Sequence, residues 1–506
     1  MTIREVLEKN AIEKPSKIYF YYDEMTHTYS EMDRFANRVA NGLASLGAKK
    51  GDHVCLLLTN IPEFIYCMYG TTKSGMVFIP INPALQADEV LYILNNCEAK
   101  YLVVEGSHLE LIRSIRDKCE YLKDVLVVGK EISKDELMFS EMMSSTSDDP
   151  PSVKVVNDDV ASIIYTSGTT GRPKGAMLTH GNYMFDASAI VKRAQMTEND
   201  RFMCILPLFH VNGQVATTLA PLYAGGSMVL VHRFSASTFF QTVDKFKPTA
   251  FSAVPTIYAM LLNTPGTEQY DLKSLRFCIC GAAPMPVEVF KNFEKKFNAS
   301  ILEGYGLSEG TCASSVNPLE KKKIGSIGTP LEGQDMKIVD ANEKELPPGE
   351  TGEIVVKGPN VMVGYYKNPE ATAATIVNEW LHTGDLGHID EDGFFYIVGR
   401  KKEMIIRGGE NIYPKEIEEV LYQHADVVEA AVCGVPDKFY GEEVKAFIQL
   451  RPGSAKSEKD YLDYCFSKLA RYKCPKSVAF VDEMPKTATG KIQKRKLIED
   501  PRWTAE

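Results

Sequence analysis

The sequence has no run of about 18 apolar residues, so no integral membrane segment is expected. Its first residues, Met1–Glu8, are charged and amphipathic, and the apolar segment of a secretory signal does not follow them. The eleven cysteines form no CxxC pair and no regular spacing, which argues against a disulfide framework in a chain of 506 residues. These absences predict a reduced, cytoplasmic protein.

The sequence also lacks an excess of positive charge, because it has 57 Lys and Arg residues and 67 Asp and Glu residues, which gives a net charge of −10. A nucleic-acid-binding protein would need a basic surface, so no nucleic-acid partner is expected. Two short basic runs, Lys321–Lys323 and Lys494–Lys496, are typical of solvated faces. The nine histidines complete neither an HExxH metal motif nor a Ser-His-Asp order.

Hydrophobic residues make up 44% of the chain and charged residues 25%, the composition of a globular protein of several compact units. Residues 1–158 and about 159–330 each alternate strand and helix patterns, which predicts α/β architecture with parallel-type sheets covered by helices. Residues 331–399 have shorter strands between Gly and Pro turns and are predicted to form a β-rich subdomain. A small α+β unit is expected over 403–506.

Individual elements are predicted from periodicity and capping. They are a helix with a capping box at Ser30–Asp33, strands at His53–Leu58, Met76–Asn82 and Tyr101–Val104, helices after Pro62 and over Ala87–Asn96, a connector over Ser140–Asp159, a strand within Glu353–Lys357, a helix from Pro414, strands at Val428–Cys433 and Val444–Leu450, and a helix capped by Ser457.

The strongest local signal is the loop Tyr165–Gly175, which follows an apolar strand at Ala161–Tyr165. Its glycines free the backbone to turn N–H groups toward an anion, while its hydroxyl groups and Lys174 can bind phosphate oxygens. The loop is not a Walker motif, because Lys174 stands between Pro173 and Gly175. The segment Gly304–Glu309 fails the dinucleotide fingerprint at its last position. A phosphate-binding loop of another kind is therefore predicted.

A second block, Glu303–Glu309, places an aromatic ring and an acid on one short segment. Tyr305 can stack on a purine, and Glu309 is a hard oxygen ligand suited to Mg²⁺ bound together with substrate phosphates.

In this order, the blocks resemble the acyl-adenylate-forming superfamily of acyl-CoA synthetases, peptide-synthetase adenylation domains and beetle luciferases. The resemblance covers essentially the whole chain and is greatest to bacterial fatty-acid–CoA ligases. It implies that ATP and a carboxylic acid give acyl-AMP and pyrophosphate, and that CoA then gives acyl-CoA and AMP, with Mg²⁺ as cofactor. A medium- or long-chain fatty acid is the default substrate, and an aromatic or short branched acid is the alternative.

The resemblance also implies the site residues. Lys491, Glu309, Lys174 and His210 are expected to be catalytic, with His210 as a wall and gate of the acyl pocket, and Glu309 and Thr166 are expected at the metal. The expected nucleotide contacts are Thr166, Ser167, Gly168, Thr169, Thr170, Gly171, Lys174, Gly281, Ala282, Ala283, Glu303, Gly304, Tyr305, Gly306, Leu307, Ser308, Asp385, Arg400 and Lys491.

Family members rotate a small C-terminal domain between the two half-reactions. By resemblance, residues 1–399 form the large domain, 400–402 the hinge with Lys402 at its centre, and 403–506 the mobile small domain. Gly408, Gly409 and Tyr440 are expected to contact CoA.

The expected acyl pocket consists of Phe209, His210, Val211, Val254, Gly306, Gly310, Thr311 and Cys312, with Ile257 as a further apolar wall and the small residues Gly306, Gly310 and Ala313 leaving room. Asn212 and Gln214 either face a functionalised acid or bond to loop backbone, the second being favoured. A carrier protein as acceptor, a luciferase-like oxidation and a homodimer stay open. An amino-acid-activating domain is disfavoured, since Pro207–Gln214 contains no acidic residue. A non-catalytic ATP-binding regulator is disfavoured because both Lys491 and Glu309 are present.

Overall fold

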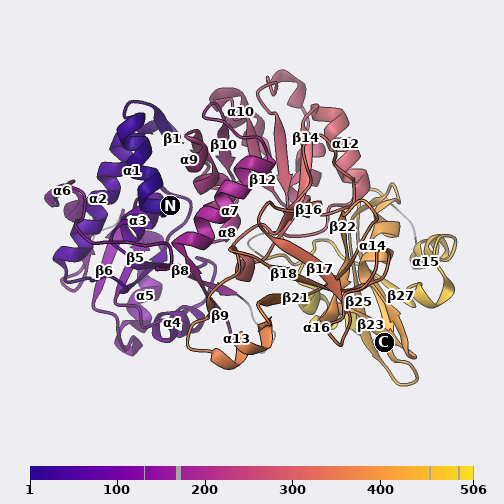
Figure 1. Cartoon of the computed structure of the whole chain (residues 1–506). Helices are drawn as coiled ribbons and strands as arrows, with labels where there is room; N and C mark the ends of the chain where they lie inside the picture. The colour runs from indigo at the N-terminus through magenta and orange to yellow at the C-terminus, as the bar shows by residue number, and fades with distance from the viewer. Residues whose placement is uncertain (130–131, 167–171, 455–456, 488–489, 505–506) are drawn as a thin grey trace.

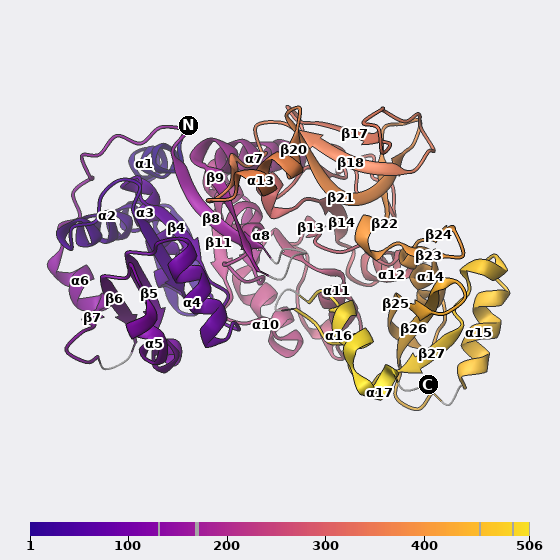
Figure 2. The ribbon, with the colours of Figure 1, turned by 90° about the horizontal axis from the view of Figure 1, so that it is seen from below.

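The computed structural model of the chain describes residues 1–129, 132–166, 172–454, 457–487 and 490–504. Two large sheets lie beside each other, a smaller sheet lies over their junction, and a fourth sheet belongs to a small carboxy-terminal domain at one end of the molecule (Figures 1 and 2). The fold class predicted from the sequence is confirmed.

The first large sheet has eight strands, and its inner strands pair in parallel. In spatial order they are β19 (Gly364–Tyr365), β9 (Lys174–Thr179), β8 (Val160–Thr166), β4 (Val77–Pro80), β3 (His53–Leu57), β5 (Tyr101–Glu105), β6 (Asp124–Val128) and β7 (Leu137–Met138).

The second large sheet has nine strands and is also parallel at its centre. In order they are β16 (Thr329–Pro330), β15 (Ser315–Val316), β14 (Ser300–Tyr305), β13 (Phe277–Cys280), β12 (Ala250–Ala253), β10 (Arg201–Cys204), β11 (Ser227–Leu230), β1 (Ile18–Tyr22) and β2 (Met25–Thr28). The predicted division near residue 158 does not separate the sheets, because β1 and β2 join the second sheet and β8 and β9 the first.

Helices cover both faces of the two large sheets, and alternate strand residues enter different cores. In β3, Val54 and Leu56 face the core between the sheets, whereas Cys55 and Leu57 face an outer core. The helices of the large domain are α1 (Ile3–Glu13), α2 (Tyr29–Ser45), α3 (Pro62–Lys73), α4 (Ala87–Asn96), α5 (Leu109–Ile115), α6 (Phe139–Ser145), α7 (His180–Arg193), α8 (Val211–Gln214), α9 (Ala220–Ala224), α10 (Ala236–Phe246), α11 (Pro255–Leu262), α12 (Val287–Phe297) and α13 (Pro369–Thr375). No helix among the described ranges is long and apolar enough to cross a bilayer.

The two smaller sheets are mostly antiparallel. The β-rich subdomain has β17 (Asp335–Val339), β18 (Gly352–Lys357), β20 (Ile376–Val377), β21 (Trp380–Ile389) and β22 (Phe395–Arg400). The small domain has β23 (Ile405–Arg407), β24 (Glu410–Ile412), β25 (Val427–Asp437), β26 (Gly441–Leu450) and β27 (Ser477–Phe480), with α14 (Pro414–Tyr422), α15 (Glu458–Phe466), α16 (Lys494–Glu499) and α17 (Pro501–Thr504).

Two local predictions are corrected. The N-cap of α2 is Thr28, whose side chain accepts the Glu31 N–H while Glu31 bonds back to Thr28, so the capping box starts two residues before the predicted Ser30. Glutamate three residues after threonine completes both bonds of the box, whereas the predicted pairing of Ser30 with Asp33 is not formed. The predicted connector from Ser140 is helical in its first part, because α6 continues to Ser145.

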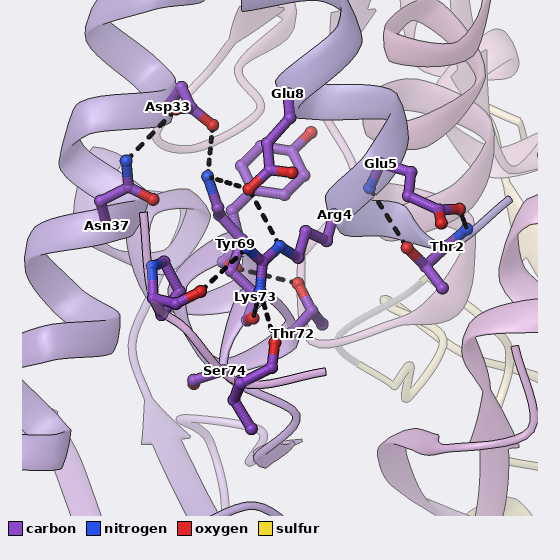
Figure 3. Close-up of polar contacts among 12 residues, drawn as sticks. Thr2, Arg4, Glu5, Glu8, Asp33, Asn37, Tyr69, Thr72, Lys73 and Ser74 are labelled. Atoms are coloured by element: carbon purple, nitrogen blue, oxygen red, sulfur yellow. Dashed lines mark hydrogen bonds and ion pairs between the residues drawn. The ribbon is translucent and has the colours of Figure 1, made fainter. Parts of the chain in front are cut away.

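A buried ion cluster holds α1 against α2 and α3 (Figure 3). Lys73 is 0% exposed, and its ammonium lies 2.5 Å from Asp33 and 3.1 Å from Glu8. Arg4 pairs with Glu8 at 2.9 Å and donates to the carbonyl of Val153, in the segment that leads to β8. The cluster therefore joins the amino-terminal helix to the chain that enters the first sheet.

We expect Lys73→Met to lower the free energy of unfolding by about 3 kcal/mol, because Asp33 and Glu8 would lose a buried cation while staying partly buried themselves. Lys192→Met is the matched control, since Lys192 pairs with Glu332 at 3.1 Å on the surface with side chains 60% and 74% exposed. Its expected cost is below about 1 kcal/mol. Chemical denaturation measures both, and equal losses would contradict the importance given to the buried cluster.

Candidate active site

The candidate site is built from the ends of strands that belong to different sheets. Thr166 ends β8, Tyr305 ends β14, and Asp385 lies in β21. Crevices outside the carboxyl ends of parallel strands are the usual ligand sites of α/β sheets. The described contacts join these ends into two polar groups, with Lys491 of the small domain near both.

The first group surrounds Glu309. Thr166 and Lys174 face each other across the β8–β9 hairpin, and the Thr166 hydroxyl donates to Glu309 Oε1 at 3.3 Å. The Tyr365 hydroxyl donates to the same oxygen at 2.8 Å, and the Lys174 ammonium lies 5.0 Å from the centre of the Tyr365 ring. Burial and the Glu309 charge raise the pKa of Tyr365, so its phenol stays a neutral donor. The predicted phosphate-loop residues Ser167, Gly168, Thr169, Thr170 and Gly171 lie outside the described residues.

The second group surrounds Asp385. Asp385 and Arg400 are cross-strand neighbours on β21 and β22, and Arg400 Nε lies 2.9 Å from Asp385 Oδ1. The Tyr305 hydroxyl donates to Asp385 Oδ2 at 2.7 Å, which fixes the orientation of the Tyr305 ring. Burial and the neighbouring carboxylate raise the pKa of Tyr305 well above its ordinary value, so this donor also stays neutral.

Lys491 reaches this site from the small domain. Gly490, at φ +80°, packs so closely on the start of α11 that an added Cβ would lie 2.7 Å from Thr256 Oγ1 and 3.0 Å from Val254 Cγ2. Burial of the ammonium among protein atoms lowers the pKa of Lys491 and the Arg400 charge lowers it further, while Asp385, Glu309 and Glu403 oppose the shift. The residue as a whole is exposed, whereas its ammonium is the part that protein atoms surround. The Gly490 contacts therefore dock the Lys491 loop on the large domain, where charges of both polar groups act on the ammonium.

His210 lies beside the same ammonium. Burial, followed by the charge of Lys491, lowers the pKa of His210 to about 4, so its ring is neutral at neutral pH. The ring packs against Phe209 at 4.3 Å between centroids. A neutral, packed imidazole fits the predicted wall of the acyl pocket better than a charged group.

The stretches Gly281–Ala283 and Glu303–Gly306 run side by side, because Cys280 pairs with Glu303 and Gly281 approaches the Gly304 carbonyl. The Glu303 carboxyl accepts the Met285 N–H at 3.1 Å. Burial raises its pKa to about 7, opposed by Lys415 and supported by Glu419, both on α14. The Glu303 carbonyl accepts from the Asn317 N–H at 2.9 Å and from the Asn317 side-chain amide at 3.2 Å, so its carboxyl and its carbonyl both have protein partners.

Two family models match the chain. The model described as AMP-binding enzyme matches residues 7–366, and the AMP-binding enzyme C-terminal domain matches residues 416–491. The chain belongs to the AMP-binding enzymes.

Its similar proteins are CoA ligases. A long-chain-fatty-acid–CoA ligase of Bacillus subtilis is 37% identical over 99% of this chain and 94% of its own length. A feruloyl-CoA synthase of Amycolatopsis is 37% identical over 92% of each chain. The crystal structure of an anthranilate CoA ligase with anthranoyl-AMP has a TM-score of 0.94 at 34% identity, covering 98% of this chain and 96% of that one. This AMP-binding enzyme is therefore an acid–thiol ligase of the AMP-forming type.

Gly306 and Gly310, the glycines predicted to leave room for the acyl group, both lie close to other parts of the chain in this AMP-binding enzyme. An added Cβ on Gly306 would lie 1.7 Å from the Cys312 carbonyl oxygen, and one on Gly310 would meet Leu307 and Ser314 at 3.3 Å. The Cys312 backbone therefore requires glycine at position 306, whereas the close contacts of Gly310 are with side chains. The part of both glycines in the acyl pocket stays a prediction. Thr311 is fully buried and donates to the Asn360 carbonyl at 2.6 Å, so its side chain is occupied elsewhere.

The favoured interpretation of Gln214 is confirmed, since its amide donates to the Leu208 carbonyl at 2.8 Å and accepts from Tyr183. The amide oxygen of Asn212 is buried and has no hydrogen-bond partner within the described chain. Sequence reasoning missed Tyr365, which contacts Glu309 from 56 residues away. No motif marks Tyr365, and only its strand pairing with Ala176 beside the phosphate loop identifies it.

Proposed function

We propose that this enzyme activates a medium- or long-chain fatty acid as acyl-AMP and transfers the acyl group to CoA. The observation that carries the proposal is the close contact of Gly490 with Thr256 and Val254, which docks the Lys491 loop on the large domain, together with the Glu309 and Asp385 charges that act on Lys491. A cation there would serve the acid, the phosphates and the ribose. The apolar Phe209, Val211, Val254 and Ile257 near this point support an acyl chain. The 37% identity to a long-chain ligase supports it as well.

In the first half-reaction a carboxylate oxygen attacks the α-phosphorus of ATP, and the bond to the bridging oxygen breaks with its electron pair leaving on pyrophosphate. The attacking acid is already ionised at neutral pH, so no general base is required, which agrees with the neutral His210. Lys491 and Lys174 would stabilise the charge that develops on the phosphoryl oxygens. Asp385 would accept hydrogen bonds from ribose hydroxyls, with Arg400 beside it, and Tyr305 would stack on adenine.

The residues present fit a magnesium ion. Mg²⁺ binds through one or two carboxylates together with substrate phosphates, and Glu309 with the Thr166 hydroxyl at 3.3 Å offers such an oxygen pair. When bound, the ion would neutralise phosphate charge. The described ranges contain no cluster of three or more His, Cys, Asp or Glu residues that could hold a metal without substrate.

In the second half-reaction the CoA thiolate attacks the acyl carbonyl and AMP leaves. We propose that the small domain turns about Lys402 and brings Gly408, Gly409 and Tyr440 to the site. Gly408 and Gly409 have φ of +58° and +91°, which favours glycine and leaves backbone open to a close ligand. Tyr440 is 52% exposed, and the Arg407 guanidinium lies 5.3 Å from its ring centre. The exposed aromatic ring suits the adenine of CoA, while Arg407 is held in place by an ion pair with Glu443 at 2.8 Å.

We expect Tyr440→Ala to raise the KM for CoA about tenfold, because stacking of one base on an aromatic ring contributes about 1–3 kcal/mol. Pyrophosphate exchange, which does not use CoA, should keep its rate. Phe466→Ala is the matched control, since Phe466 is 47% exposed on α15 of the same domain. An unchanged KM for CoA, or an equal rise in both variants, would contradict a contact between Tyr440 and CoA.

A panel of acids tests the substrate. Acyl-CoA formation should have its highest kcat/KM with unbranched acids of about 8 to 18 carbons, because each buried CH₂ contributes about 0.8 kcal/mol. An aromatic acid is the second candidate, favoured by the similarity to feruloyl and anthranilate ligases and by the Asn212 amide oxygen, which has no partner among the described residues. A preference for hydroxylated aromatic acids would replace the fatty-acid proposal. Exchange of pyrophosphate without thioester formation from CoA would instead indicate a carrier-protein acceptor.

A further inference from the structure

A second lysine of the Lys491 segment lies in an ion cluster of the small domain. Lys494, the first residue of α16, places its ammonium 2.8 Å from Glu418 and 3.4 Å from Glu403. Its side chain is 23% exposed and that of Glu418 17%, so this pair is largely shielded from water, whereas the Glu403 side chain is 37% exposed. Shielded pairs are less screened by salt than surface pairs and depend more on geometry.

The two carboxylates belong to different parts of the small domain. Glu418 lies on α14 and also accepts the Val432 N–H of β25 at 2.8 Å, so it is fixed to the body of the domain. Glu403 ends the 3₁₀ turn Lys401–Glu403, directly after the predicted hinge residue Lys402. Lys494 therefore connects the start of α16 to the domain body and to the hinge turn.

Only two residues separate Lys494 from Lys491. The Thr487 N–H donates to the Lys491 carbonyl and the Gly490 N–H donates to the Thr487 carbonyl, each at 2.8 Å. These bonds join Thr487, Gly490 and Lys491, so the place of Lys491 depends on what holds the chain at the two ends of this group. Lys494 is a charged anchor at one of these ends, and Glu403 is also among the carboxylates whose charge acts on Lys491.

We propose that Lys494 and Glu403 are positioning residues whose ion pair fixes the Lys491 loop to the hinge turn, so that closure of the small domain brings Lys491 to one defined place at the reacting phosphate. The proposal rests on the proposed function. The Lys494–Glu403 ion pair would affect acyl-AMP formation and have little effect on thioester formation, because Lys491 leaves the site in that step. A misplacement of about 1 Å can lower a rate by about 100-fold, so a weak anchor would have a large effect.

The test compares Lys494→Met, Lys494→Arg, Glu403→Gln and the double variant Glu403→Gln with Lys494→Met. Lys496→Met is the matched control, because Lys496 is an exposed lysine on the same helix. Each protein is assayed for pyrophosphate exchange with ATP and acid, and for conversion of supplied acyl-AMP to thioester. Thermal unfolding is recorded for each, so that a loss of folding is seen separately.

We expect Lys494→Met to lower the kcat of pyrophosphate exchange by about 10- to 100-fold with little change in the KM for ATP and a loss in thioester formation of about twofold or less. Lys494→Arg should restore most of the rate, since arginine keeps the charge. The double variant should be no worse than Lys494→Met, because both changes break one interaction. A normal exchange rate in Lys494→Met, equal losses in both half-reactions, or additive losses in the double variant would overturn the proposal. Absence of exchange in the unaltered enzyme would instead reject the proposed function.

Discussion

Replacing Lys491 with alanine should lower the rate of acyl-AMP formation by about 100- to 1,000-fold, or about 3 to 4 kcal/mol, the usual cost of removing one preorganised donor from a charged transition state. The charges of Arg400, Asp385 and Glu309 act on the ammonium, and Lys491 would share with Lys174 the stabilisation of charge growing on the phosphoryl oxygens. Conversion of supplied acyl-AMP to thioester should change far less, because Lys491 leaves the site in the proposed second orientation. Pyrophosphate exchange and single-turnover thioester formation measure the two steps separately.

Lys496→Ala, a nearby exposed lysine, is the control for Lys491→Ala and should leave both rates within about twofold. Equal losses of the two half-reactions in Lys491→Ala would contradict the assigned function of this residue. They would mean that Lys491 serves folding or a step common to both reactions.

Lys402→Pro should leave pyrophosphate exchange largely intact and lower CoA thioester formation by about 100-fold or more. In the present orientation Lys401–Glu403 form a 3₁₀ turn, whose φ of about −50° to −70° proline also adopts. Proline fixes this φ, so a rotation that changes φ at Lys402 becomes unfavourable. The small domain would stay docked with Lys491 at the site, and Gly408, Gly409 and Tyr440 would seldom reach it.

Lys402→Ala is the matched control, because alanine removes the same side chain and leaves φ free. Both half-reactions should survive in it. If they also survive together in Lys402→Pro, the small domain does not rotate about this residue, and Lys402 is an ordinary surface lysine.

Much of the candidate site follows from residues whose chemistry is visible locally. Thr166, Lys174 and Glu309 stand in blocks whose hydroxyls or charges suit nucleotide chemistry, and the structure brings them together. Asp385, Arg400 and Lys491 were predicted only through the resemblance to a family. Element types were also predictable, because apolar runs and caps act within a few residues, as the exact bounds of α4 and the Ser457 cap illustrate.

What the sequence does not reveal depends on long-range packing. Tyr365 becomes a partner of Glu309 only because β19 pairs with β9. Gly306 suggests free space in the sequence, whereas in the fold the Cys312 carbonyl fills it. The Glu303 carboxyl accepts the Met285 N–H from 18 residues away, and no local signal indicates that β1 and β2 join the second sheet.

The most direct test of the central claim is a product analysis with ATP, a fatty acid and CoA, and with CoA left out. We predict one AMP and one pyrophosphate for each acyl-CoA formed, and acyl-AMP with acid-dependent pyrophosphate exchange when CoA is absent. Formation of ADP and phosphate, or thioester without acid-dependent exchange, would contradict activation through an acyl-adenylate.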